Sequence, residues 1–176
     1  MKIFIIALLL SFSTFAKDVE LAFGGDAYLS LQNWSNVGQQ TDSKIGVGLG
    51  GDFGVGVKLD NMKLIVGPHL GYNHWSQNYS KNGATSSVYV ATTDTGMVLM
   101  ADMDDFILKL GAGTSKLSMG YTINGETYEY PMDRSFSYKS VSIGFNLKPV
   151  IFSIGVTNYS ELKSANRGEF SIGIGF

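Results

Sequence analysis

A long alternation of apolar and polar residues, repeated along the chain, is the feature that most limits how this sequence can fold. In residues 19–32 the odd positions are mostly large and apolar, and the even positions are mostly polar or small. Residues 44–59 repeat the alternation, with glycine, lysine and aspartate between the apolar side chains. Since successive side chains of a β-strand point to opposite faces, the pattern predicts strands with one apolar and one polar face.

The same alternation defines eight predicted strands. They span residues 19–32, 44–59, 63–75, 87–103, 106–121, 137–147, 150–159 and 169–176. Two-residue turn signals at 60–61, 104–105 and 148–149 alternate with longer links around 33–43, 77–86, 122–134 and 160–168. We therefore expect an antiparallel, up-and-down arrangement, with the tight turns and both termini at one end and four longer loops at the other.

The apolar face of these strands is expected to meet lipid. Charged residues make up 16% of the chain, against about 25% in typical soluble domains. An eight-stranded barrel has a narrow interior, so the smaller, glycine-rich polar face fits inside and the bulky apolar face lies outside. Closure pairs every backbone group that lipid cannot satisfy. The predicted fold is all-β, an eight-stranded antiparallel up-and-down transmembrane β-barrel; the competing class is a soluble secreted barrel that carries a lipid-like ligand.

The first residues have the form of an export signal. Lys2 precedes the apolar run 3–10, and the small residues Thr14 and Ala16 precede the charged Lys17. This order of features is typical of a secretory signal peptide. We expect residues 1–16 to be the signal peptide and residues 17–176 to be the barrel.

Polar residues on the inner face form the candidate interior site. The predicted inward positions that can carry charge are Asp26, Asp52, His69, Asp94, Lys109 and Glu169. Charges in so narrow a lumen must pair to offset their desolvation. We therefore expect a plug of acidic residues around Lys109 and no wide pore, with a possible bulge in the strand 87–103.

Charge and composition also exclude several functions. The chain has no cysteine and a net charge of −2. We expect no metal site, no cofactor and no binding to nucleic acid.

The last strand carries the most specific signal in the chain. It alternates apolar residues and ends in a terminal aromatic residue, with Phe170, Ile172, Ile174 and Phe176 on one face. This ending resembles the C-terminal assembly signal of Gram-negative outer-membrane barrels. Tyrosine and tryptophan also cluster near the long-loop ends, which is typical of an interfacial girdle. The residues expected in this girdle are Trp34, Tyr72, Trp75, Tyr79, Tyr89, Tyr121, Tyr138 and Tyr159.

The whole chain is similar in plan to the small eight-stranded families typified by the outer-membrane proteins A, X and W. The resemblance implies a location in the cell outer membrane, contact with outer-membrane lipid and lipopolysaccharide, and recognition by the barrel-assembly machinery. We expect a monomer without enzymatic activity, with a structural, adhesive or narrow-channel role carried by the outer loops. The acidic and aromatic segment 122–134 is the most interaction-like of these loops.

An enzymatic alternative rests on two residues. His74 and Ser76 resemble the His-x-Ser element of the outer-membrane lipid A 3-O-deacylases, in which the serine attacks an acyl ester and the histidine is the base. That resemblance implies a lipid A acyl-ester hydrolase with Ser76 as nucleophile and His74 as base. The position of the motif in mid-chain departs from the family, and a rim histidine among aromatic residues is the competing interpretation.

Overall fold

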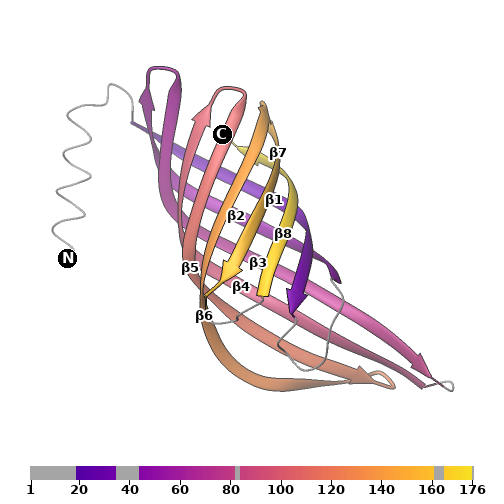
Figure 1. The fold of residues 1–176 in the computed structure, drawn as a ribbon. Helices are drawn as coiled ribbons and strands as arrows, with labels where there is room; N and C mark the ends of the chain where they lie inside the picture. Colours follow the sequence, from indigo (N-terminus) through magenta and orange to yellow (C-terminus); the bar gives the residue numbers. More distant parts are fainter. Residues whose placement is uncertain (1–18, 35–43, 82–83, 161–164, 176) are drawn as a thin grey trace.

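The computed structural model describes residues 19–34, 44–81, 84–160 and 165–175, so the predicted signal peptide lies outside the described residues. The eight strands are β1 (Val19–Trp34), β2 (Lys44–Leu59), β3 (Met62–Lys81), β4 (Ala84–Met103), β5 (Phe106–Ile123), β6 (Glu126–Leu147), β7 (Val150–Tyr159) and β8 (Ala165–Gly175). Each strand pairs antiparallel with its neighbours in sequence, and β1 also pairs with β8, which closes the barrel (Figure 1). The predicted fold is confirmed. Within the described ranges, no helix is long and apolar enough to cross a membrane.

Two connections expected as long loops are instead the ends of long hairpins. β5 continues to Ile123 and β6 begins at Glu126, so Asn124 and Gly125 alone form the turn. Both have positive φ, of 50° and 89°, which is the backbone that an Asn-Gly hairpin turn requires. β3 and β4 likewise extend to Lys81 and from Ala84. The prediction of a loop over residues 122–134 is therefore wrong. The two long hairpins extend past the rest of the barrel (Figure 1).

Strand parity separates the two faces of the wall as predicted. Outward positions on all eight strands carry exposed apolar side chains, among them Leu21, Phe23, Leu49, Phe53, Leu70, Leu99, Leu110, Val141, Ile154, Phe170 and Ile172. Such a surface is stable when it faces lipid, because exposing this much apolar area to water would be unfavourable. A soluble lipid carrier would need the opposite arrangement, with the apolar face inside.

The register of β4 contains no bulge. Its pairing with β3 and with β5 is continuous over the described residues, so Val98, Met100 and Asp102 do share the inner face with Asp94. The irregularity lies instead between β5 and β6, where the register shifts between Leu117 and Met119. This shift lies where β5 and β6 extend beyond the first pair of β6 with β7, Tyr138 with Tyr159.

Inward glycines allow the narrow barrel to curve. A Cβ atom at Gly67 would collide with the backbone oxygen of Phe53 on β2, and one at Gly113 would collide with the backbone oxygen of Thr95 on β4. The neighbouring strand thus occupies the space where a side chain would be. At these two positions glycine is required by close backbone approach.

Candidate functional site: a closed lumen and an outer sheet

The part of the lumen nearer the tight turns holds an ion cluster around Lys109. Its Nζ lies 2.5 Å from Asp52 Oδ2 and 3.5 Å from Asp26 Oδ2. His69 Nδ1 lies 2.7 Å from Asp52 Oδ1. These four residues come from four strands, β1, β2, β3 and β5, so the cluster ties opposite sides of the wall together across the lumen.

A second cluster, centred on Arg167, lies further toward the long hairpins. Arg167 Nη2 donates a hydrogen bond to Asp94 Oδ2 at 2.8 Å, and Arg167 Nε donates to Glu169 Oε1 at 2.5 Å. Nη1 donates to Thr92 Oγ1 at 3.2 Å, and Thr157 Oγ1 donates to Glu169 Oε1 at 3.0 Å. Arg167 is 4% exposed and Asp94 is 1% exposed, so the pair is shielded from water.

The predicted interior residues therefore divide between two centres. Asp26, Asp52 and His69 lie with Lys109, whereas Asp94 and Glu169 lie with Arg167. Arg167 was missed because the last strand was taken to begin at Glu169. Extending the alternation backwards from Glu169 by one repeat would have found it.

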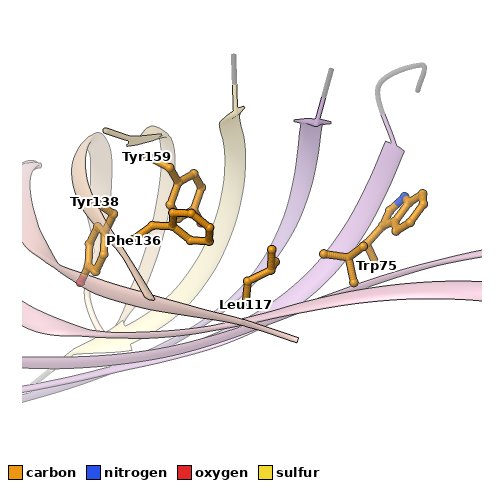
Figure 2. Close-up of a cluster of buried hydrophobic side chains, with 6 residues drawn as sticks. Trp75, Leu117, Phe136, Tyr138 and Tyr159 are labelled. Atoms are coloured by element: carbon orange, nitrogen blue, oxygen red, sulfur yellow. The ribbon is translucent and has the colours of Figure 1, made fainter. Parts of the chain in front are cut away.

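An apolar and aromatic plug closes the lumen on the long-hairpin side of the Arg167 cluster. It consists of the buried side chains Trp75, Val90, Leu117, Phe136, Tyr138 and Tyr159. Figure 2 shows five of them labelled, contributed by β3, β5, β6 and β7. Tyr159 also lies beside the guanidinium of Arg167, 5.8 Å from ring centroid to Cζ, and so joins the plug to the ion cluster. Trp75, Tyr138 and Tyr159 were expected in the girdle, and their inward orientation is a correction.

Two separate cavities lie in the described part of the lumen. A cavity of about 400 Å³ lies at the tight-turn end and reaches inward to Asp52. A second, of about 40 Å³, lies between the two ion clusters and is lined by Lys109, Tyr138 and Arg167, among others. That volume has room for only one or a few waters.

Beyond the plug, one side of the wall continues as an open sheet. We define the outer sheet as residues 75–81 of β3, 84–90 of β4, 117–123 of β5 and 126–136 of β6. The four segments are paired in this order out to Lys81 with Ala84 and Ile123 with Glu126, and the ladder of β5 with β6 is interrupted at residues 131–133. In Figure 1 the two hairpins project past the other strands.

The outer sheet reverses the polarity of the barrel. Its inner face is mostly apolar and carries Trp75, Val88, Val90, Leu117, Met119, Tyr121, Ile123, Tyr128, Tyr130 and Phe136, with the charged Glu126 and Arg134 among them. Its outer face is mostly polar and carries Ser76, Ser87, Ser118, Thr122, Thr127 and Glu129, with Tyr89 among them. In the membrane section the outward face of the strands is apolar, whereas in the outer sheet the inner face is the more apolar one. The outer sheet is therefore built for water on one face and for a packed contact on the other.

The tip of the inner face is exposed and ordered by local contacts. The rings of Tyr121 and Tyr128 stack with centroids 5.2 Å apart, and Tyr130 is 61% exposed. Tyr128 Oη donates a hydrogen bond to Glu126 Oε2 at 2.6 Å. That bond to the carboxylate raises the pKa of Tyr128, so the tyrosine stays protonated.

His74 and Ser76 lie on the outward face of β3, at the rim. The His74 ring stacks on Tyr89, with centroids 5.9 Å apart, and Tyr89 covers Gly120. Among the described residues no hydrogen bond joins His74 to Ser76, and no carboxylate orients His74. The two residues share a face without the contact that activates a serine, so the hydrolase hypothesis stays a prediction.

The C-terminal pattern is outward-facing where it is described. Phe170, Ile172 and Ile174 are all exposed on the lipid side of β8, and Phe176 lies outside the described residues. Their role as an assembly signal stays a prediction.

Comparison with known proteins finds solved structures with a similar fold. No family model matches the sequence, and no curated protein matches it. Among solved structures, the N-terminal β-barrel domain of OprF from Pseudomonas aeruginosa is similar with a TM-score of 0.55 at 10% identity, covering 90% of this chain and 100% of that domain. Ail, the attachment invasion locus protein of Yersinia pestis, is similar with a TM-score of 0.50 at 12% identity, covering 89% of this chain and 97% of Ail.

At these identities the likeness establishes the fold, and the predicted similarity to small outer-membrane barrels is confirmed at that level. A closed β-barrel with an outward apolar belt is the form in which proteins cross bacterial outer membranes. The fold and the belt are those of an outer-membrane protein, in agreement with the predicted location.

Proposed function

We propose that this chain is an integral outer-membrane barrel that acts by binding at the cell surface, through the outer sheet, and is neither a channel nor an enzyme. The observation that carries the proposal is the reversal of polarity above the plug, which leaves an apolar, tyrosine-rich face exposed outside the membrane section. An exposed aromatic face of this kind is typical of interaction surfaces. Ail, one of the structures with the same fold, is named for attachment and invasion.

The closed lumen supports a binding role over a channel role. A permeating solute would have to pass the Lys109 cluster, the Arg167 cluster and then the plug. Opening such a path would separate buried charges from their partners, at a cost of several kcal/mol each. A lumen built this way stabilises the wall that carries the outer sheet.

The surroundings of the barrel follow from its surface. We propose that the apolar belt contacts outer-membrane lipid and lipopolysaccharide, that the barrel-assembly machinery inserts the chain, and that the barrel is a monomer without nucleic-acid partners. Closure supports the monomer, because the described strands leave no unpaired edge within the belt.

A shortened hairpin tests the proposed function. Residues 120–129 would be replaced by a two-residue Asn-Gly turn, and cells that display either chain would be compared for attachment to cultured epithelial cells. The shortened barrel should still show heat-modifiable migration in detergent gels and should lose most of the attachment. Liposomes containing either protein should exclude arabinose. Unchanged attachment, or arabinose entry with the intact protein, would contradict the proposal.

A further inference from the structure

The larger of the two described cavities lies at the end of the barrel opposite the outer sheet. Its volume of about 400 Å³ is within the range of pockets that hold small organic molecules, about 300–1,000 Å³. Residues of the tight turns at 60–61, 104–105 and 148–149 line its outer part, and Asp52 lies at its inner end. Since the outer sheet is proposed to lie at the cell surface, the mouth of this cavity faces the periplasm.

Apolar side chains line the wall between the mouth and the inner end. Ile65, Met100, Ile107 and Ile151 come from β3, β4, β5 and β7 in that order. Water beside such side chains makes few hydrogen bonds with the wall, so an apolar group that displaces this water is favoured. The cavity is therefore suited to a ligand with an apolar body.

Asp102 is a half-buried carboxylate of the same wall, and it forms no ion pair with any described residue. Its partner in the ladder of β3 with β4 is Lys63, but the Nζ of Lys63 lies 2.6 Å from Glu20 Oε2. Asn146 Nδ2 donates a hydrogen bond to Asp102 Oδ1 at 3.1 Å, and Asn146 is itself buried. A neutral amide thus orients the carboxylate and leaves its charge unmatched.

The other charged residues at the mouth are poorly placed to select a ligand. Lys58 and Asp60 carry opposite charges and are both exposed, so water screens them. The carboxylate of Asp104 already lies 3.6 Å from Lys148 Nζ. Asp102 is therefore the side chain expected to set the charge of a ligand, and a carboxylate favours a positive one.

We propose that this cavity binds a small organic cation, one that joins a primary ammonium group to an apolar body about the size of a phenyl ring. The ammonium group donates hydrogen bonds to the carboxylate of Asp102. The apolar body lies among Ile65, Met100, Ile107 and Ile151. This inference goes beyond the proposed function and does not depend on it, because the cavity and the outer sheet lie at opposite ends of the barrel.

The test uses the whole chain, refolded in lipid nanodiscs with isotope-labelled methionine methyl groups, and phenethylammonium chloride as the probe. Met100 lines the cavity, whereas Met97 on the same strand faces outward and is 53% exposed. As the amine is added, the NMR signal of the Met100 methyl group should shift along a saturable curve. The Met97 signal should show no saturable shift, because it reports only the partition of the probe into lipid.

Matched probes separate recognition of charge from apolar binding. Phenethyl alcohol, a neutral molecule of similar shape, should bind at least about tenfold more weakly than the amine, because it cannot form a charge-assisted hydrogen bond with Asp102. Phenylpropionate carries a negative charge and should give no saturable shift of Met100. These comparisons use the wild-type chain, so they do not depend on whether a variant folds.

One substitution and its control assign the recognition to Asp102. Asp102→Asn should weaken binding of the amine about tenfold and leave binding of the alcohol unchanged. Asp105→Asn makes the same change at a turn residue that does not line the cavity, and should leave both affinities unchanged.

Four results would each overturn the inference. They are the absence of a saturable Met100 shift, a parallel shift of Met97 and Met100, equal affinity for the amine and the alcohol, and an unchanged affinity of the folded Asp102→Asn variant for the amine.

Discussion

Arg167 and Asp94 are separated by 73 positions in sequence, yet the guanidinium of one donates a 2.8 Å hydrogen bond to the carboxylate of the other across the lumen. The strands that carry them, β8 and β4, are not neighbours in the barrel. The contact therefore holds β8 and β4 at a fixed distance across the lumen, next to the plug.

Removal of the Arg167 charge should destabilise the barrel strongly. Arg167→Met leaves Asp94 and Glu169 without their shared cation, and breaking a buried pair in this way costs about 3–5 kcal/mol. The free energy of unfolding would be measured by urea titration of the refolded protein in lipid vesicles. The double variant Arg167→Met with Asp94→Asn should be less destabilised than the sum of the two single variants. Strict additivity would show that the two side chains do not interact energetically.

Alanine at Gly67 should be costly although the change adds only one methyl group. The new Cβ would meet the backbone oxygen of Phe53, so the strands would have to separate, and over-packing of this kind costs about 1–3 kcal/mol. Gly24→Ala is the matched control, because its Cβ would have an ordinary contact of 3.7 Å with Ile174 O. The same urea titration reports both variants, and equal losses would argue against close approach as the reason for Gly67.

Arginine on the outer face should report depth in the membrane. Val141 and Leu147 both face outward on β6, but Leu147 is the last residue before the tight turn and Val141 lies further into the belt. Val141→Arg should cost about 2–4 kcal/mol and Leu147→Arg about 0–1 kcal/mol. The difference would be measured by unfolding in vesicles. A soluble barrel would tolerate both variants, so a negligible cost for Val141→Arg would contradict the lipid-facing assignment.

Loss of the terminal aromatic residue should impair assembly in cells and leave the folded barrel stable. Phe176→Ala removes the last residue of the proposed assembly signal and changes no residue in the described ladder of β8 with β1. The variant should accumulate several-fold less in the outer membrane than wild type, and should refold to equal stability in vesicles. Leu147→Ala, also at the tight-turn end of the belt, is the control for a lost apolar side chain. Normal accumulation of Phe176→Ala in the outer membrane would show that Phe176 is not part of the assembly signal.

The sequence predicted the membrane section well and the outer sheet poorly, for one physical reason. Alternation reveals a strand when one face stays apolar along its length, as it does from Phe106 to Ala112 on β5. At the rim the apolar side chains change faces, so the residues from Thr122 onward, Ile123 among them, looked like a loop when judged by the lipid-facing pattern. The Asn124-Gly125 turn was the local signal for a continued hairpin. Arg167 was missed for a related reason, because its strand begins before the apolar belt does.

The pairing of β1 with β8 has a consequence for how the protein is made. Every other ladder joins strands that are consecutive in sequence, whereas this one joins residues 24–34 to residues 165–175, from the first and the last strand. A chain that stops short of β8 keeps two unpaired edges, which lipid cannot satisfy. Insertion therefore cannot be completed strand by strand as the polypeptide emerges. The belt can close only once β8 is available to pair with β1.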